Sequence, residues 1–89
     1  MVVTKEKVIQ KALKYIRTCQ DVTNPRITSV MKIESEEPPS WFWEIELIVD
    51  WTYDRECTFT LMYSIHGTMY SVGILCPKIR PGERMPRLP

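Results

Sequence analysis

The sequence predicts an α+β domain in which one N-terminal helix packs on a four-stranded antiparallel meander, followed by a tail rich in proline and arginine. Three observations predict this fold class. Residues 41–53 carry an apolar side chain at every odd position, which is typical of a strand with one buried face. Residues 4–19 have apolar side chains at helical spacing. Residues 57–76 form two apolar-rich stretches around a central His66-Gly67 pair, which indicates a hairpin.

The helix is expected from about Thr4 to Cys19. Thr4 is a candidate N-cap, and Glu6 in the first turn interacts favourably with the helix dipole. The apolar stripe that should face the sheet consists of Val8, Ile9, Ala12, Leu13 and Ile16. Asn24 precedes a proline, which disfavours the helical conformation, so the helix should end before it.

Two strands are expected next, at residues 26–34 and 41–53, joined by a polar, proline-containing loop. In the first of them we expect Ile27, Met31 and Ile33 to share one face. In the second, the odd positions should be buried. The even positions that should remain wet are Glu44, Glu46, Asp50 and Thr52.

A two-residue turn at His66-Gly67 sets the expected register of the last two strands. If Ile65 faces Thr68, the pairs that follow all lie on one apolar face, and they are Tyr63–Tyr70, Leu61–Val72, Phe59–Ile74 and Cys57–Cys76. An apolar face that coincides on both strands supports this register. His66 is then a turn residue, and without a second histidine it is a poor candidate for a metal ligand.

The register predicts that Cys57 and Cys76 face each other at a hydrogen-bonded position, with α-carbons about 5.5 Å apart. That distance allows a disulfide. An odd number of cysteines without CxxC spacing argues against a disulfide scaffold. A reducing compartment would also oppose the bond. We therefore expect two buried free thiols, and a disulfide or a metal or redox site remain the alternatives. Cys19 has no evident partner.

The outer face of the sheet carries the candidate binding site. If a turn at residues 54–56 pairs Tyr53 with Cys57, then Ile48 faces Met62, and Met69 lies beside Ser64. An apolar spot of Ile48, Met62 and Met69, rimmed by Glu44 and Glu46, would be typical of a protein contact. The alternative is that these are scattered surface side chains, which are common.

Charge is distributed unevenly along the chain. Residues 1–31 carry a net charge of +4, residues 32–56 carry −6, and residues 57–89 carry +3. We expect a single domain at residues 1–76 and an extended or disordered basic tail at residues 77–89. Arg80 and Arg84 in this tail are candidates for contacts with an acidic protein or with phosphate, and the alternative is a solubilising tail.

Several function classes are not expected. The three glycines are isolated, so there is no phosphate-binding loop. Two glutamates on an open sheet face lack the pocket that catalysis needs. No apolar run reaches the roughly 18 residues of a membrane span. We expect no catalytic residue, cofactor, metal or membrane span, and a cytoplasmic location.

The middle of the chain resembles the gas vesicle protein O family. The tryptophan-led strand with its internal glutamate carries the resemblance, as does the following hairpin with its turn glycine; the residues are Trp41, Trp43, Ile45, Glu46, Leu47, Ile48, Phe59, Leu61, Tyr63, Gly67 and Met69. Lys78 and Arg80 occupy the place of that family's basic C-terminal segment. The PepSY-like group of small helix-plus-sheet modules has the same plan. The resemblance implies an accessory role in assembling a protein-walled organelle, without catalysis.

The sequence therefore predicts a small, non-enzymatic protein–protein interaction module. Its partner would be another protein, or a second copy of the chain, bound through the outer sheet face. The alternative from another class is a nucleic-acid-binding regulator that uses the basic helix and tail. Nucleic-acid binders usually present one large basic surface, whereas the net charge of this chain changes sign from one segment to the next, which argues against this alternative.

Overall fold

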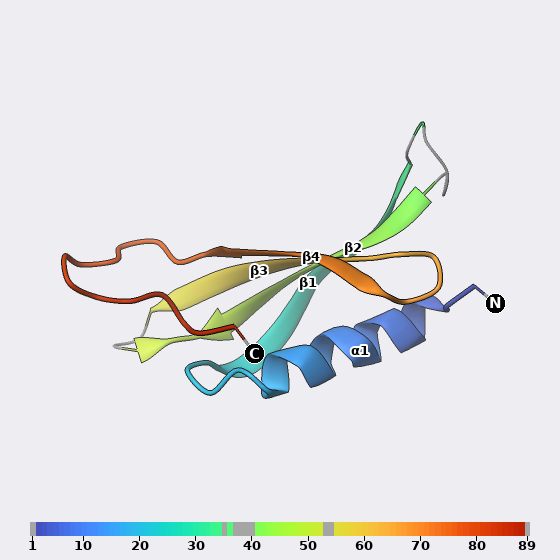
Figure 1. The fold of residues 1–89 in the computed structure, drawn as a ribbon. Helices are drawn as coiled ribbons and strands as arrows, with labels where there is room; N and C mark the ends of the chain where they lie inside the picture. Colours follow the sequence, from blue (N-terminus) through green and yellow to red (C-terminus); the bar gives the residue numbers. More distant parts are fainter. Residues whose placement is uncertain (1, 35, 37–40, 53–54, 89) are drawn as a thin grey trace.

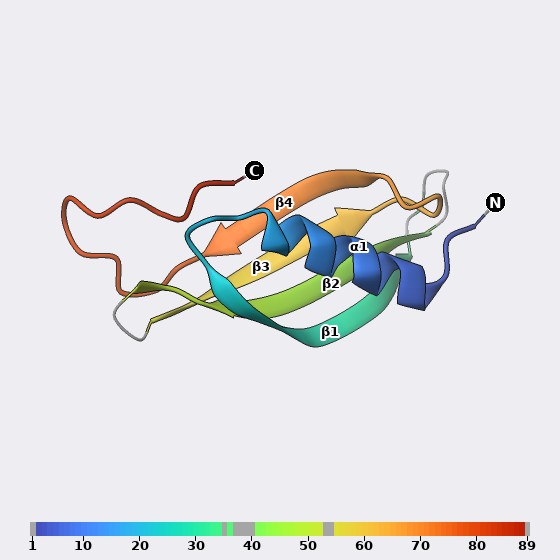
Figure 2. The ribbon, with the colours of Figure 1, turned by 90° about the horizontal axis from the view of Figure 1, so that it is seen from below.

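The computed structural model describes residues 2–34, 36, 41–52 and 55–88. The elements are α1 (Lys5–Arg17), β1 (Thr23–Glu34), β2 (Trp41–Asp50), β3 (Glu56–Tyr63) and β4 (Met69–Leu75). The strands form one antiparallel sheet in the order β1-β2-β3-β4. Helix α1 lies diagonally across one face of this sheet (Figures 1 and 2). The predicted α+β class and four-stranded meander are confirmed.

Helix α1 begins where its capping residue predicts. The Thr4 side chain accepts a hydrogen bond from the Lys7 backbone N–H at 3.2 Å, which satisfies one of the free N–H groups of the first turn. Val8, Ala12 and Ile16, each four residues apart, are buried against the sheet. Ile9 and Leu13 of the expected stripe are only half-buried.

The core lies between α1 and the odd positions of β2 and β3. Its largest fully buried side chains include Ile45 and Leu47 of β2 and Phe59 and Leu61 of β3. Each of these lies opposite another core residue across the β2–β3 ladder, as Leu47 does with Phe59. The alternation of β2 therefore assigns its buried face as expected, except that Tyr53 lies outside the described residues.

A β-bulge changes the expected facing of β1. Ile27 pairs with Leu47 and Ser29 pairs with Glu46, so Thr28 is an extra residue on β1. Ile27 packs against the core, whereas Met31, opposite Glu44, is on the outer face. The expectation that Ile27, Met31 and Ile33 share a face is therefore wrong, because the bulge shifts the alternation by one residue.

The register of β2 and β3 differs from the predicted one by four residues. Ile48 faces Thr58 instead of Met62, and Glu46 faces Thr60 instead of Ser64. The hairpin closes earlier than expected, because the Trp51 N–H donates to the Arg55 carbonyl at 2.7 Å. The Arg55 guanidinium also stacks over the Trp51 ring at 4.4 Å, which stabilises this closure. A shift by an even number of residues leaves every side chain on its predicted face.

The β3–β4 hairpin confirms the predicted register away from the turn and corrects it near the turn. Leu61 pairs with Val72, and Phe59 pairs with Ile74. Ser64 N–H donates to the Thr68 carbonyl, which makes the loop three residues long, with Gly67 at φ +86°. Such loops need a left-handed third residue, which glycine adopts without strain. The predicted two-residue turn, with Ile65 facing Thr68, is therefore wrong.

The longer loop is followed by a second irregularity. Tyr63 pairs with Met69 and Met62 pairs with Ser71, so Tyr70 is an extra residue and does not face Tyr63. As a consequence, Met69 packs against the core on the helix side. Its predicted place on the outer face is wrong for this reason.

Cys57 and Cys76 face each other as predicted, but they form a disulfide, so the expected pair of free thiols is wrong. Their α-carbons are 4.4 Å apart, the spacing of a non-hydrogen-bonded pair, instead of the expected hydrogen-bonded pair. Cys19 is a free, buried cysteine.

Candidate functional site

A row of side chains crosses all four strands on the outer face of the sheet. Met31, Glu44, Met62 and Ser71 are successive cross-strand partners, and they place a carboxylate between two methionines. Cross-strand neighbours are in direct side-chain contact range. In the described part of the chain, no helix covers this face (Figure 1).

Aromatic and aliphatic side chains extend the row on one side. Ile33 pairs with Phe42, and the Phe42 ring contacts the Tyr70 ring edge-on, with centroids 5.8 Å apart. Burial and the nearby Glu44 carboxylate raise the pKa of Tyr70. Tyr70 is 55% exposed and Met31 is 47% exposed, so a large apolar area meets solvent. We call the five apolar side chains around Glu44 the outer patch: Met31, Ile33, Phe42, Met62 and Tyr70.

The structure brings together some of the predicted binding residues and separates others. Glu44 and Met62 are direct neighbours in the outer patch, and Glu46 follows Glu44 on the same face of β2. Ile48 is on this face too, four residues along β2 from Glu44, where it pairs with Arg26 and Thr58. Met69 is on the opposite face. The predicted contiguous spot of Ile48, Met62 and Met69 does not form.

The segment after β4, which contains Arg80 and Arg84, runs beyond the other end of the sheet (Figures 1 and 2). This segment turns back toward the C-terminal end of α1, where the Arg87 N–H donates to the Asp21 carboxylate at 2.9 Å. Pro86 is buried. Arg84 lines an open groove of about 580 Å³ with the oppositely charged Asp21 and Glu83. The two arginines are thus remote from the outer patch.

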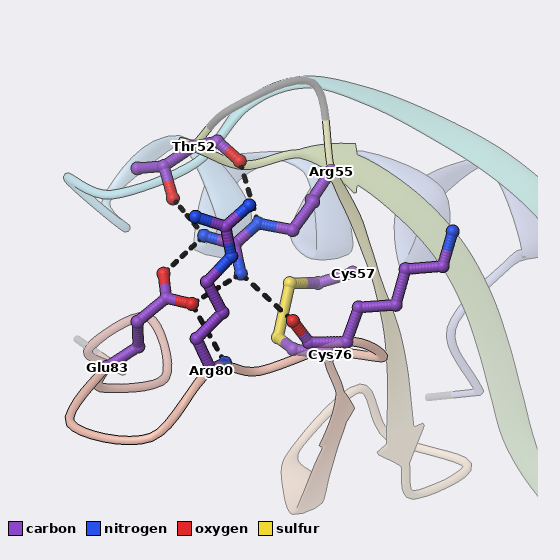
Figure 3. Close-up of polar contacts among 7 residues, drawn as sticks. Thr52, Arg55, Cys57, Cys76, Arg80 and Glu83 are labelled. Atoms are coloured by element: carbon purple, nitrogen blue, oxygen red, sulfur yellow. Dashed lines mark hydrogen bonds and ion pairs between the residues drawn. A yellow bond between two sulfur atoms is a disulfide. The ribbon is translucent and has the colours of Figure 1, made fainter.

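Arg55 holds the C-terminal segment to the β2–β3 turn (Figure 3). Its guanidinium donates to the Thr52 carbonyl, to the Lys78 carbonyl at 3.1 Å and to both carboxylate oxygens of Glu83. The Arg55 side chain is only 11% exposed, and Glu83 also accepts a hydrogen bond from the Arg80 N–H. These hydrogen bonds lower the pKa of Glu83 from its usual 4.5 to about 2.

We expect Glu83→Gln to loosen this segment while the sheet stays folded. A bidentate, charge-assisted contact is replaced by weaker neutral hydrogen bonds. Trypsin should therefore cleave after Lys78 and Arg84 about tenfold faster than in the wild type, because the segment separates from the β2–β3 turn more often. Glu34→Gln, an exposed carboxylate of β1, is the matched control. Equal cleavage rates in both variants would show that Glu83 does not hold the segment.

The same contact should respond to pH. The pKa of Glu83 is lower in the folded protein than in the unfolded chain, so the stabilisation is fully present above pH 4.5 and is lost as the pH falls toward 2. The amide NMR signals of residues 77–88 should shift toward random-coil positions over this range, and they should not do so in Glu83→Gln.

A second groove, of about 350 Å³, lies on the helix side between α1 and the start of β4. Its lining includes Lys11 and Lys14 of α1 and, from the hairpin, Tyr63 and Met69. Burial raises the pKa of Tyr63 to about 12, so its hydroxyl is neutral at physiological pH. The groove is shallow, and among the described residues no cluster of three histidines, cysteines or carboxylates that could hold a metal accompanies it.

Glu44 and Glu46 are half-buried on the open outer face of the sheet. In the hydrogen bonds of the described residues, the Glu46 carboxylate accepts one from the Thr28 hydroxyl at 3.2 Å. An apolar surface around one carboxylate suits binding better than chemistry. No helix within the described ranges is long and apolar enough to cross a membrane.

Comparisons with protein-family models, with curated proteins and with solved structures give no match.

Sequence reasoning missed most of the outer patch. Phe42 has an even position in β2, which is a signal that could have found it, because even positions of that strand are on the outer face. Met31, Ile33 and Tyr70 reach this face only through the bulges at Thr28 and Tyr70. The Arg55–Glu83 contact joins residues 28 positions apart and has no local signal.

Proposed function

We propose that this chain is a non-enzymatic protein-interaction module that binds a protein partner with the outer patch. The observation that carries this proposal is the clustering of five apolar side chains around Glu44 on the sheet face opposite α1. Apolar clusters with a polar centre are typical of protein contacts, in which a few apolar and aromatic anchors supply most of the binding energy. Glu44 favours a partner that places a lysine or arginine within an apolar surface.

Met62→Lys is expected to weaken partner binding by at least about thirtyfold, because it places a charge among the anchors of the interface. The free energy of unfolding should change by less than about 1 kcal/mol, since Met62 lies on the outer face and does not contribute to the core. The partner would first be identified with a photo-crosslinker placed at position 62. Its affinity for the wild type and for Met62→Lys would then be measured by calorimetry.

Thr58→Lys is the matched control, because Thr58 lies on the same face of β3 but outside the outer patch. It should bind as the wild type does. Unfolding of Met62→Lys would mean that the face is covered within the chain, and unchanged binding would mean that the partner uses another surface.

The alternative function is that of a nucleic-acid-binding regulator that uses the basic helix and tail. Arg84 and Arg87 share their groove with Asp21 and Glu83, so this surface mixes both signs of charge. A protein partner is therefore the better-supported proposal. A role in assembling a protein-walled organelle stays the prediction that the family resemblance implies. The cytoplasmic location, expected from the sequence, also stays a prediction. The disulfide bears on the location, because such bonds persist mainly in oxidising compartments.

A further inference from the structure

We propose that β4 pairs with β4 of a second copy of this chain, so that the two sheets join into one antiparallel sheet across a twofold axis. This inference goes beyond the proposed function, because it concerns the edge of the sheet and not the outer patch.

The two edges of the sheet are unlike. The edge strand β1 carries Pro25, Arg26, Lys32 and Glu34 and has two register shifts, all of which hinder pairing with another chain. The edge strand β4 has the sequence MYSVGIL, without a charged residue or a proline. Its irregularity at Tyr70 is close to the turn, and Ser71–Leu75 pairs regularly with β3. Of the two edge strands, only β4 therefore lacks the charged residues and proline that usually prevent an edge strand from pairing with another chain.

The backbone of β4 presents unused hydrogen-bonding groups along this edge. The 4.4 Å spacing of Cys57 and Cys76 marks a non-hydrogen-bonded pair, and such pairs alternate along the ladder. The N–H and C=O groups of Val72 and Ile74 therefore point away from β3. In the described residues, no backbone hydrogen bond joins the outward edge of β4 to another segment.

A second copy fits these groups in one register. With the twofold axis at Gly73, Val72 of each copy faces Ile74 of the other, and each of these two pairs exchanges two hydrogen bonds. Gly73 would face Gly73 of the second copy, where the two strands come closest. There is open space at this position, since an added Cβ would meet nothing nearer than the Thr60 carbonyl oxygen at 3.8 Å. Leu75, which is 68% exposed, would gain Ser71 of the other copy as a cross-strand neighbour.

Charge also favours a second copy. A strand without charges meets an identical strand without repulsion, whereas it offers no ion pair to a charged partner. The acidic residues Glu44 and Glu46 are on β2, two strands away from the proposed axis. A twofold contact needs only one self-complementary surface, which β4 supplies. The outer patches of both copies would then lie on the same face of the joined sheet.

The test is the molar mass in solution, measured by light scattering after size-exclusion chromatography over a wide concentration range. The wild type should have twice the 10.5 kDa mass of the chain, and Gly73→Lys should have the mass of one chain, because two like charges meet at the axis. Ser29→Lys, on the β1 edge, is the matched control and should remain a dimer. Mixing Gly73→Lys with Gly73→Glu should restore the dimer, which also shows that both variants fold.

Two further results separate this inference from the proposed function. Met62→Lys should keep the dimer mass but lose the partner, and Gly73→Lys should lose the dimer but still bind the partner. A wild type that is monomeric at every concentration would overturn the β4 contact. So would a dimer that survives Gly73→Lys, or one that Met62→Lys dissociates while Gly73→Lys does not; the last result would assign self-association to the outer patch.

Discussion

Replacing Leu47 by alanine is expected to lower the free energy of unfolding by about 2–5 kcal/mol, the range for removing a fully buried leucine. Leu47 has no exposed surface, and its neighbours across the sheet are Ile27 on β1 and Phe59 on β3. The substitution removes apolar contacts and leaves a cavity that these packed neighbours fill only in part. Urea denaturation, followed by tryptophan fluorescence, measures the change.

Glu46→Ala is the control for this prediction, because Glu46 adjoins Leu47 in the chain but lies on the opposite face of β2. Its carboxylate accepts one exposed hydrogen bond, from Thr28. Its loss should cost less than about 1 kcal/mol. Equal costs for the two substitutions would contradict the assignment of buried and outer faces in β2.

The second large effect is expected at the disulfide. Replacing both Cys57 and Cys76 by alanine should lower the free energy of unfolding by about 3 kcal/mol, because the bond closes a loop between residues 19 apart and restricts the unfolded chain. Arg55 and Lys78, whose contact holds the C-terminal segment, are each two residues from one of these cysteines in the sequence. The double variant should therefore also loosen residues 77–88.

Reduction of the wild type provides a comparison without a substitution. A reducing agent should lower its stability to that of the double variant and leave the double variant unchanged. Cys19→Ala is the matched control, since Cys19 is buried but free, and it should respond to the reducing agent as the wild type does. Intact mass after alkylation of the unfolded, unreduced protein should show one labelled thiol. Three labelled thiols would contradict the disulfide.

Much of the fold could be predicted from local patterns of side chains in the sequence. The capping role of Thr4, the helix stripe of Val8, Ala12 and Ile16, and the buried face of β2 follow from side-chain periodicity and from hydrogen bonds between near neighbours. The Cys57–Cys76 pairing was predicted as well, although the turn from which the prediction started is wrong. The real turn is one residue longer than the predicted one, and the extra residue Tyr70 on β4 offsets this difference. The predicted pairs are therefore found from Leu61 onward.

The candidate site was harder to predict because it depends on features that join distant parts of the chain. Whether Met62 lies beside Ile48 or beside Glu44 depends on where the β2–β3 hairpin closes. That closure involves the stacking of Arg55 on Trp51 and the contact of Arg55 with Glu83, which is 28 residues away. No local sequence signal reports such a contact.

The sequence by itself thus determined the elements of this protein and the buried faces of α1, β2 and β3, because these depend on the spacing of side chains along a regular backbone. Only the tertiary structure decided the register of the strands and the positions of the bulges at Thr28 and Tyr70. These two features determine which side chains form the outer patch. The physical reason is that register and bulges are selected by the packing of whole strands against their neighbours. A slip of two residues keeps every side chain on its face and leaves the sequence pattern unchanged.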